Sequence, residues 1–449
     1  MAARPRRPDR RLTPARAVAY RVLRRVTADA AWADRVFRAE AGRARLEPRE
    51  RAFAQQLAYG TVQRMRTLDH ALAAASSRPL DQVDPALLDA LRLGAYQVLY
   101  LDGVPDHAAV EQTVELVKAE QPRASGFANA VMRRVTREGR AAIDAIDDST
   151  PEGAALKHSH PDWVARMWWE QLGPDAAREL MARDNEPPES AIRANELVTT
   201  RDALAEQIEV PTRPAPGVPE GLVLEAPWDA HGSPLFAAGA LIPQSRGSMT
   251  VARVLDPKPG DRVLDMAASP GAKTTHIAAL SHGEAHITAM ERNPQRAESL
   301  TANVERMRAP NVDVITGDAH DAPAGPFDRI LLDPPCSDLG TLQARPDVRW
   351  HKSVDQIEEL AALQRELIDA ALERLHPGGV LVYSSCTISP RENEEQIERL
   401  LADRPDVGRD DLTQERPELA HPSFPGYLQL LPHRDGADGF FIARLRRRG

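Results

Sequence analysis

Apolar residues in the first third of the chain recur at three-and-four spacing, which predicts helices. Val110, Val114 and Val117 show this spacing, and alternation of β-branched residues is nearly absent up to Glu138. The breaks expected at helix starts carry a proline or an acidic residue, and they are Glu47-Pro48-Arg49, Val83-Asp84-Pro85 and Gly103-Val104-Pro105. We predict an all-α bundle over residues 13–140, preceded by a disordered basic tail at residues 1–12.

The next segment, residues 141–235, mixes a tryptophan-rich helix with a proline-heavy stretch, Pro211-Thr-Arg-Pro-Ala-Pro-Gly-Val-Pro219. We interpret it as a connecting α+β subdomain. Trp163, Trp168 and Trp169 follow helical spacing, which favours core packing over a platform for stacking bases.

From about Pro257 the pattern changes to short apolar strands alternating with helices. The expected strands are Arg262 to Asp265, His286 to Met290, Val312 to Ile315, Arg329 to Asp333 and Val380 to Ser384. This alternation predicts a multidomain protein whose residues 236–449 form a Rossmann-like α/β domain with a doubly wound, mostly parallel sheet. Ligands of such sheets lie beyond the carboxyl ends of the strands, so the residues that follow each strand matter most.

Small residues follow the first expected strand, in the run Asp265-Met-Ala-Ala-Ser-Pro-Gly-Ala-Lys-Thr274, and small side chains let the backbone approach a ligand closely. A phosphate-binding P-loop is disfavoured because alanine stands at 267 and 272 where that motif has glycine. Glu291 and Asp318 follow the next two strands, where acids can accept hydrogen bonds from a ribose and an adenine amino group. An adenosine cofactor without a pyrophosphate fits this pattern better than NAD.

The chain has two cysteines, Cys336 and Cys386, and each follows a strand end. A lone buried cysteine is usually a packing residue, but these two strands should be neighbours, about 4.8 Å apart. Two thiols at one pocket suit methylation of pyrimidine C5, since a thiolate added at C6 makes C5 nucleophilic. Asp333 could bind N3 and the exocyclic amine of that base. In the alternative, methylation of an exocyclic amine, Asp333-Pro-Pro would precede an aromatic residue, whereas here it precedes Cys336.

Composition limits the class of protein. A chain of 449 residues exceeds one usual core, and it contains no apolar run of the roughly 18 residues that a membrane helix needs. With no secretory signal pattern and few cysteines, we expect a cytoplasmic protein. The net charge of -9 disfavours nucleic-acid binding mildly, yet nine arginines lie in the first 25 residues and Arg444, Arg446, Arg447 and Arg448 end the chain.

These motifs together resemble the bacterial 16S rRNA cytosine-5 methyltransferases of the RsmB (Sun/Fmu) type, over nearly the whole chain. The segment from Thr13 to Arg134 resembles a NusB-like RNA-binding domain. The matching motifs of this segment and of the connecting part are Arg49-Glu-Arg-Ala-Phe-Ala, Leu57-Ala-Tyr-Gly-Thr-Val62, Leu91-Arg-Leu-Gly-Ala-Tyr-Gln97, Phe127-Ala-Asn-Ala-Val-Met-Arg-Arg134, His160-Pro-Asp-Trp163 and Arg193-Ala-Asn195. Those of the catalytic part include Arg345-Pro-Asp-Val-Arg-Trp350, Ser389-Pro-Arg-Glu-Asn-Glu394 and Asp438-Gly-Phe-Phe-Ile-Ala-Arg444. The family usually has glycine and threonine where this chain has Ala272 and Ser385, and Ala272 would alter the cofactor loop if positive φ were needed there.

The resemblance implies an enzyme that uses S-adenosyl-L-methionine, with Cys386 attacking C6, Cys336 assisting release and Asp333 between cofactor and base. The implied cofactor-binding residues are Ala267, Ala268, Ser269, Pro270, Gly271, Ala272, Lys273, Glu291, Arg296, Asp318 and Asp333. It implies small-subunit rRNA, naked or in a partial ribosomal particle, as the partner, and we expect a monomer without a resident metal or membrane contact. The phosphate-binding arginines stay open among Arg64, Arg66, Arg133 and Arg134, as does the alternative of a non-catalytic RNA-binding assembly factor.

Overall fold

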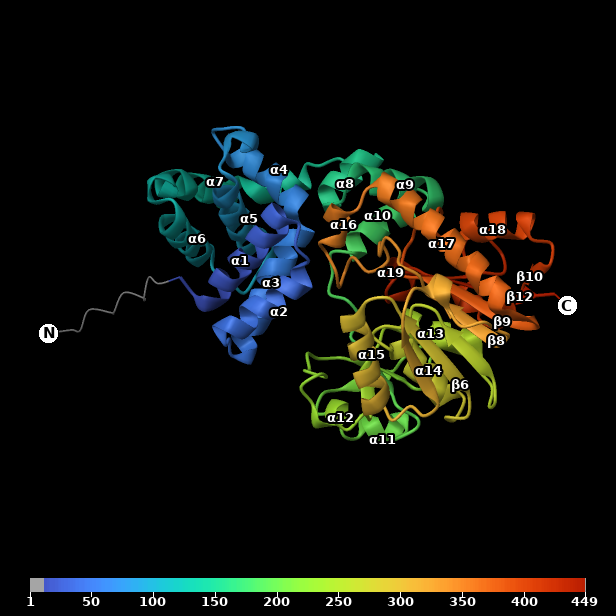
Figure 1. Cartoon of the computed structure of the whole chain (residues 1–449). Coiled ribbons are helices and arrows are strands. Elements are labelled where there is room, and N and C mark those ends of the chain that lie inside the picture. Colours follow the sequence, from blue (N-terminus) through green and yellow to red (C-terminus); the bar gives the residue numbers. More distant parts are fainter. Residues whose placement is uncertain (1–11, 449) are drawn as a thin grey trace. The chain divides into compact units, whose positions relative to one another are not determined.

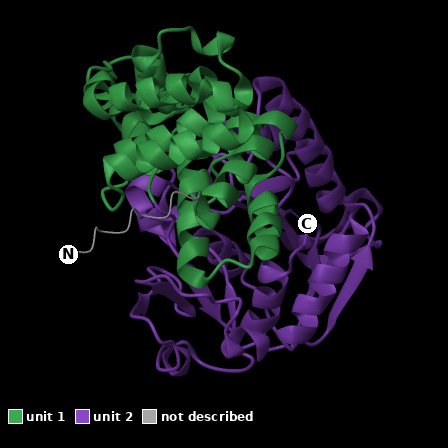
Figure 2. Ribbon diagram, turned by 90° about the vertical axis from the view of Figure 1, so that its left-hand side faces the viewer, with its two compact units in different colours: residues 1–186, 342–351 green, residues 187–341, 352–449 purple. Residues whose placement is uncertain are grey.

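The computed structural model describes residues 12–448, which form two compact units (Figure 2). The first, here called the helical unit, comprises the chain up to Glu186 together with residues 342–351. The second, the sheet unit, comprises residues 187–341 and 352 onward. The predicted basic tail, residues 1–12, lies outside the described residues except for Leu12.

The helical unit consists of α-helices and short 3-10 turns (Figure 1). Its α-helices are α1 (Pro14–Asp29), α2 (Ala33–Ala44), α3 (Pro48–Gln63), α4 (Met65–Ala75), α5 (Pro85–Tyr100), α6 (Asp106–Glu120), α7 (Ser125–Asp144), α8 (Pro151–His158), α9 (Asp162–Leu172), α10 (Pro174–Arg183) and α16 (Val348–His351). Its 3-10 turns are η1 (Leu80–Gln82) and η2 (Pro122–Ala124).

The predicted helix starts are confirmed. Helix α3 begins at Pro48 and α5 at Pro85, where the Asp84 side chain accepts hydrogen bonds from the backbone N–H groups of Ala86 and Leu87. Proline suits a first helical position because its missing N–H would have no partner there. Apolar faces of α1 to α7 pack into one core, which includes Leu23, Leu57, Leu72 and Leu91.

Residues 342–351, which the sequence places between two strands of the large sheet, belong to the helical unit. The Arg349 guanidinium is fully buried and donates to the carbonyl of Ser159 at 3.0 Å and to Asn185 Oδ1 at 3.0 Å. Asp347 accepts the Ala33 backbone N–H at 2.8 Å, and the Trp350 indole donates to the Val62 carbonyl at 2.9 Å. Arg349 and Asp347 thus bond to main-chain groups of this unit.

The sheet unit contains the described strands and the remaining helices. The strands are β1 (Ala191–Ala194), β2 (Thr212–Pro214), β3 (Gly221–Leu224), β4 (Leu241–Pro243), β5 (Arg262–Asp265), β6 (His286–Glu291), β7 (Val312–Thr316), β8 (Phe327–Leu332), β9 (Leu375–Ser385), β10 (Val407–Arg409), β11 (Leu428–Leu430) and β12 (Phe440–Arg447). The helices are α11 (Arg201–Ala205), α12 (Pro234–Ala237), α13 (Arg246–Leu255), α14 (Ala272–Leu280), α15 (Pro294–Arg306), α17 (Val354–Arg374), α18 (Glu394–Asp403) and α19 (Pro432–Asp435), with 3-10 turns η3 (Ala319–Asp321), η4 (Leu412–Gln414) and η5 (Pro417–Leu419).

The larger sheet has the strand order β10-β12-β9-β8-β5-β6-β7, and β11 pairs with β12. Strands β9, β8, β5, β6 and β7 are parallel, whereas β12 runs antiparallel to β9 and to β10. Alternate strand residues point to opposite faces. Val263 and Val382 pack with helices α13 to α15, and Leu264 and Leu381 pack with α17 and α18. The predicted doubly wound, mostly parallel fold is confirmed.

A smaller antiparallel sheet, ordered β2-β3-β1-β4, precedes the large one. The predicted connecting segment, residues 141–235, is divided between the units at Glu186, since α8 to α10 belong to the helical unit. Trp168 is fully buried, in agreement with the core packing predicted from its spacing, whereas Trp163 and Trp169 are half-buried.

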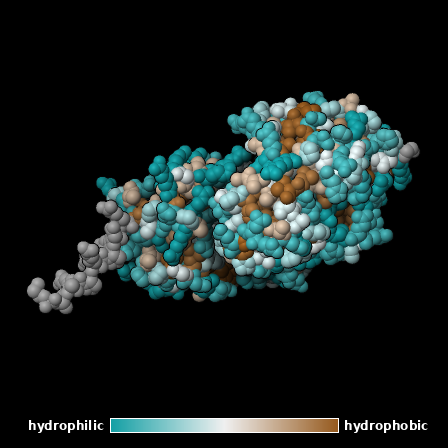
Figure 3. Space-filling model, turned by 90° about the horizontal axis from the view of Figure 1, so that it is seen from below, coloured by the Kyte–Doolittle hydropathy of each residue, from teal (hydrophilic) through white to brown (hydrophobic). Residues whose placement is uncertain are grey.

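Large apolar side chains are seldom exposed among residues 12–448, where Val354 and Phe424 are the exceptions. Polar residues surround separate apolar patches on the face shown in Figure 3. Within the same residues, none of the helices combines the length and apolar character that a membrane span requires.

Candidate active site

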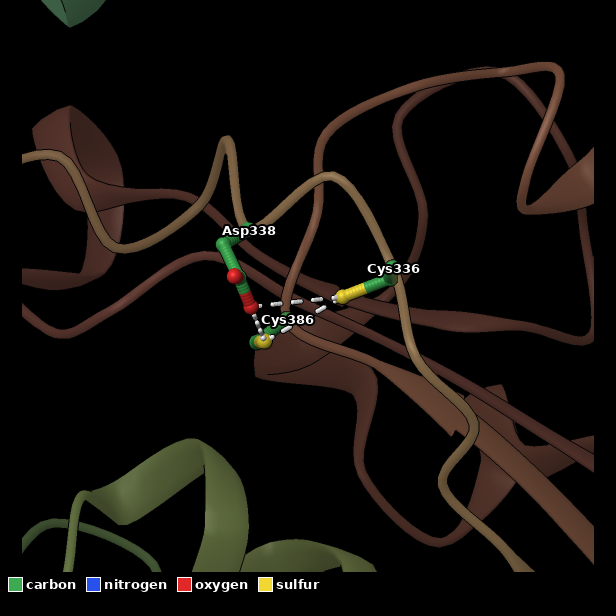
Figure 4. Close-up of side chains that lie close together, drawn as sticks. All are labelled: Cys336, Asp338 and Cys386. Atoms are coloured by element: carbon green, nitrogen blue, oxygen red, sulfur yellow. Dashed lines mark hydrogen bonds between the residues drawn. The ribbon is translucent and has the colours of Figure 1, made fainter. Parts of the chain in front are cut away.

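The two cysteines meet beyond the carboxyl ends of β8 and β9. These strands are parallel neighbours, as predicted, and the Cys336 and Cys386 sulfurs lie 3.3 Å apart. The Asp338 carboxylate points at both sulfurs (Figure 4), with Oδ1 3.1 Å from Cys386 Sγ and 3.7 Å from Cys336 Sγ. Asp338 has a φ of 60°, a left-handed conformation that asparagine and aspartate adopt more readily than most residues. Asp338 was not predicted as a site residue, because its contact with Cys386 spans 48 residues of sequence.

The buried carboxylate of Glu392 lies next to the loops that carry the two cysteines. Glu392 Oε1 accepts the Ser337 backbone N–H at 2.8 Å and the Gln364 amide at 3.1 Å, and Oε2 accepts the Ser337 hydroxyl at 2.5 Å. The Ser337 hydroxyl also lies 2.6 Å from the hydroxyl of Thr387. Ser337 and Thr387 directly follow Cys336 and Cys386, so Glu392 connects the two loops that carry the thiols.

Both thiols resist ionisation in this arrangement. The hydrogen bond with Cys336, together with burial, raises the pKa of Cys386 well above its ordinary value. The hydrogen bond with Cys386 lowers the pKa of Cys336, but burial and the charges of nearby carboxylates, Asp338 first among them, together raise it above its ordinary value. Without substrate the pair therefore holds its protons at neutral pH, and attack by Cys386 requires a step that removes one.

Lys273 and Asp333 form a short ion pair beside the thiols. The Lys273 ammonium lies 2.5 Å from Asp333 Oδ2, and the Ser384 hydroxyl donates to Asp333 Oδ1 at 3.2 Å. Burial alone would lower the pKa of Lys273, but the Asp333 charge and hydrogen bond, with a smaller effect of Cys386, raise it. Lys273 is therefore a fixed cation in this site.

The loop between β5 and α14 contains the predicted small residues. The Ala268 N–H donates to the Met290 carbonyl at 2.8 Å, and the Ser269 hydroxyl donates to the Arg296 carbonyl at 3.1 Å. Pro270 is exposed, and its carbonyl accepts a hydrogen bond from Asn303 at 2.9 Å. Ala267 is half-buried in the same loop.

Gly271 provides the backbone freedom in this loop. It has a φ of 101°, and an added Cβ would lie 2.8 Å from Leu300. Ala272 begins α14 and does not have positive φ, so alanine fits there. Buried Arg193 donates to the Ala272 carbonyl at 3.3 Å and to the Thr275 hydroxyl at 2.9 Å. Its position on β1 explains why local sequence did not reveal this support.

The three predicted acids follow successive strands but differ in exposure. Asp265 is buried and accepts the Thr274 hydroxyl at 2.7 Å, and burial raises its pKa to about 6. Glu291 is buried at the end of β6, with the Asn293 N–H at 2.8 Å and Arg296 at 3.2 Å. Asp318 is partly exposed after β7 and lies 2.7 Å from the His320 ring. Glu291 thus ends one strand of a parallel pair and Asp318 follows the other.

Several predicted phosphate ligands already have protein partners. Arg64 is largely buried over the Tyr100 ring, Arg66 pairs with Asp162 at 2.7 Å, and Arg134 donates to the Ala75 carbonyl. Arg133 is exposed. At the other end, the arginines of β12 and the residue after it bond within the sheet unit, with Arg444 and Arg446 on Asp410 and with Arg447 and Arg448 on backbone carbonyls.

Comparison with known families matches three parts of the chain. A model described as 16S rRNA methyltransferase RsmB/F matches residues 252–446, and the NusB family model matches residues 13–137. A ferredoxin-like domain of the RsmF/B-like methyltransferases matches residues 160–231.

Relatives and solved structures agree with these matches. The chain is 35% identical to the probable ribosomal RNA small subunit methyltransferase B of Synechocystis, over 96% of this chain and 99% of that protein. The crystal structure of PH0851 superposes with a TM-score of 0.80 at 25% identity, covering 97% of this chain and 99% of the other. NSun6 from Pyrococcus horikoshii, solved with the S-adenosylmethionine analogue SFG, gives 0.60 at 25% identity over 64% and 98%. The chain therefore belongs to the RsmB/F family of 16S rRNA methyltransferases, which use S-adenosylmethionine.

Proposed function

We propose that this enzyme methylates C5 of a cytosine in small-subunit rRNA through a covalent bond between Cys386 and C6. The observation that carries the proposal is the 3.3 Å separation of the two thiols beyond adjacent parallel strands. Two nucleophilic sulfurs and an acid at one point suit a reaction that forms a covalent adduct and later breaks it.

Cys386 begins the reaction by losing its proton and adding its electron pair to C6. Asp338 Oδ1, 3.1 Å from this sulfur, is positioned to accept the thiol proton. The Lys273 cation and Asp333 lie beside the base in this scheme, with Asp333 holding N3 and the exocyclic amine as charge develops on the ring. S-adenosylmethionine supplies the electrophilic methyl group.

Completion requires loss of the C5 proton and of the Cys386–C6 bond. A solvent molecule accepts the C5 proton, the C5–H electron pair restores the C5–C6 double bond, and the Cys386 sulfur leaves as a thiolate that takes its proton back from Asp338. We assign assistance of this release to Cys336, whose sulfur lies next to the leaving one. The predicted separation of roles is thus attack by Cys386 and release by Cys336.

The donor set at the sheet edge fits the cofactor. We assign the ribose to Glu291, the adenine to Asp318, and the methionine part to Ala267 through Lys273, with Arg296 beside Glu291. Two observations support this assignment. Gly271 has a positive φ that bends the loop, and carboxylate acceptors lie where the parallel strands β6 and β7 end. The helical unit would bind the phosphates of the RNA. The substrate would be either naked small-subunit rRNA or a partial ribosomal particle.

The position of the transferred methyl group tests the reaction. Purified enzyme, small-subunit RNA and methyl-labelled cofactor are incubated, and the RNA is digested to nucleosides. We expect the label in 5-methylcytidine. Label in a nucleoside methylated on an exocyclic amine would refute the C5 reaction, and label in 5-methyluridine would refute the choice of cytosine.

A further inference from the structure

We propose that Cys336, Asp338 and Cys386 form a binding site for a thiophilic divalent cation such as Zn²⁺, which would inhibit the enzyme. One ligand atom from each residue lies within 4.8 Å of the other two. The three side chains converge on one point in Figure 4. Thiolates with a carboxylate are a donor set that zinc prefers, whereas magnesium and calcium prefer oxygen ligands alone.

The spacing of the three atoms is close to one face of a zinc tetrahedron. With usual bond lengths, two sulfurs on zinc lie about 3.8 Å apart, and a sulfur and an oxygen about 3.6 Å. The observed sulfur separation is 3.3 Å, and Asp338 Oδ1 lies 3.1 Å and 3.7 Å from the sulfurs. An ion therefore fits after expansions of about half an ångström, and a solvent molecule would complete the fourth position.

A backbone contact holds the Asp338 segment beside the Cys386 loop before any ion binds. The Gly340 N–H donates to the Cys386 carbonyl at 3.0 Å, and a Cβ at Gly340 would lie 2.2 Å from the Gly439 carbonyl oxygen. The Gly340 segment follows Asp338 closely, so Asp338 is tied to the Cys386 loop. Such preorganisation lowers the ordering cost of binding.

The local charge also suits a cation. Lys273, whose ammonium interacts with Cys386, is neutralised by Asp333 at 2.5 Å. Cys386 and Asp338 are partly exposed, which gives an ion access. Binding releases one proton from each thiol and leaves both sulfurs on the metal. Inhibition of methyl transfer follows from this, a consequence that rests on the proposed function, whereas the binding itself does not.

Cobalt reports this site selectively. Full-length enzyme without RNA or cofactor is titrated with Co²⁺, whose thiolate complexes absorb in the near ultraviolet. Since the chain has two cysteines, thiolate-to-cobalt absorption can arise only from Cys336 or Cys386. We expect one Co²⁺ per chain, displaced by Zn²⁺, and a Kd at least about tenfold weaker in Asp338→Asn, because residues that merely orient ligands already contribute 10- to 100-fold.

Two further variants separate the outcomes. Cys336→Ala should abolish the tight absorbing complex, and Glu366→Gln, an exposed carboxylate near His320, should not change it. Absence of thiolate-to-cobalt absorption in the wild type, or equal affinity in Asp338→Asn, would overturn the proposed site. Tight binding with no inhibition of methylation by Zn²⁺ would overturn the inhibition alone. A protein that binds Co²⁺ but never forms 5-methylcytidine would refute the proposed function and leave the site standing.

Discussion

Glu392 offers a sharp test of how the two cysteine loops are held together. Replacing it by alanine removes the acceptor for the Ser337 N–H and the Gln364 amide, both in the protein interior. The Ser337 hydroxyl keeps a partner in Thr387 at 2.6 Å. The Gln364 amide keeps the Pro335 carbonyl at 2.9 Å, so the Ser337 N–H is the donor that loses its partner, at a cost of about 1–3 kcal/mol. Loss of a buried carboxylate offsets part of this cost, and we expect a net destabilisation of about 1–2 kcal/mol.

Glutamine at this position should preserve the arrangement. Its Oε1 can accept from Ser337 N–H and Gln364, and its amide can donate to the Ser337 hydroxyl, which still donates to Thr387. We therefore expect Glu392→Gln to fold normally and to retain activity within about threefold. Glu392→Ala should lose about 100-fold in kcat with little change in KM for the cofactor, because a displacement of about 1 Å has such an effect.

Thermal unfolding and methyl transfer are measured on the full chain, with Glu395→Ala as the control on α18. Glu395 is partly exposed and pairs with Arg391 at 2.8 Å. Burial raises the pKa of Glu392 in the folded protein above 4.5, the ordinary value that applies in the unfolded chain. As the pH rises from the unfolded to the folded pKa, this carboxyl therefore disfavours folding increasingly. Relative to Glu392→Gln, the wild type should thus lose stability across that interval. If Glu392→Ala kept wild-type kcat and unfolding temperature, the proposed support of the loops would be wrong.

Three other predictions follow from buried contacts. Because the hydrogen bond with Cys336 is the largest cause of the raised pKa of Cys386, Cys336→Ala should shift the pH dependence of Cys386 alkylation to lower pH; an unchanged midpoint by mass spectrometry would contradict this. Arg193→Met should raise the Kd for S-adenosylmethionine up to about tenfold, measured calorimetrically, since a bond to the Ala272 carbonyl contributes about 1 kcal/mol. Arg349→Met should destabilise the helical unit by about 2–6 kcal/mol, since two buried oxygen acceptors lose their donor at about 1–3 kcal/mol each, and it should expose residues 342–351 to proteolysis; wild-type resistance would contradict their place in that unit.

The sequence predicted the existence and order of the parallel strands because each contains a short apolar run with a clear end. Observed β5 has the predicted bounds, and β6 and β7 each extend the prediction by one residue. Strand β8 begins two residues before its predicted start and ends one residue before its predicted end, whereas β9 begins five residues earlier and ends one residue later than predicted. The cysteines could be paired because neighbouring parallel strands place the residues that follow them side by side. β12 was not among the predicted strands, although its first residues, Phe440-Phe-Ile-Ala443, are apolar, and its antiparallel pairing with β9 could not be read from the sequence.

Supporting residues could not be predicted because their contacts are tertiary. Arg193 lies 79 residues from Ala272, and Asp338 lies 48 residues from Cys386. Residues 342–351 stand between two strands of the sheet, so position in the chain suggested the wrong unit. The sequence could not show whether position 272 needs a positive φ, which would disfavour alanine. In the structure Gly271 adopts the positive φ, and Ala272 does not.

Denaturing gel electrophoresis of enzyme incubated with small-subunit RNA and S-adenosylmethionine tests the two-thiol reaction most directly. Wild type, Cys336→Ala and Cys386→Ala are compared. We expect Cys336→Ala to accumulate a slowly migrating RNA adduct, because release is impaired, and Cys386→Ala to form neither adduct nor methylated RNA. Unchanged methyl transfer by both variants would mean that the cysteines are packing residues and that the reaction proceeds without them.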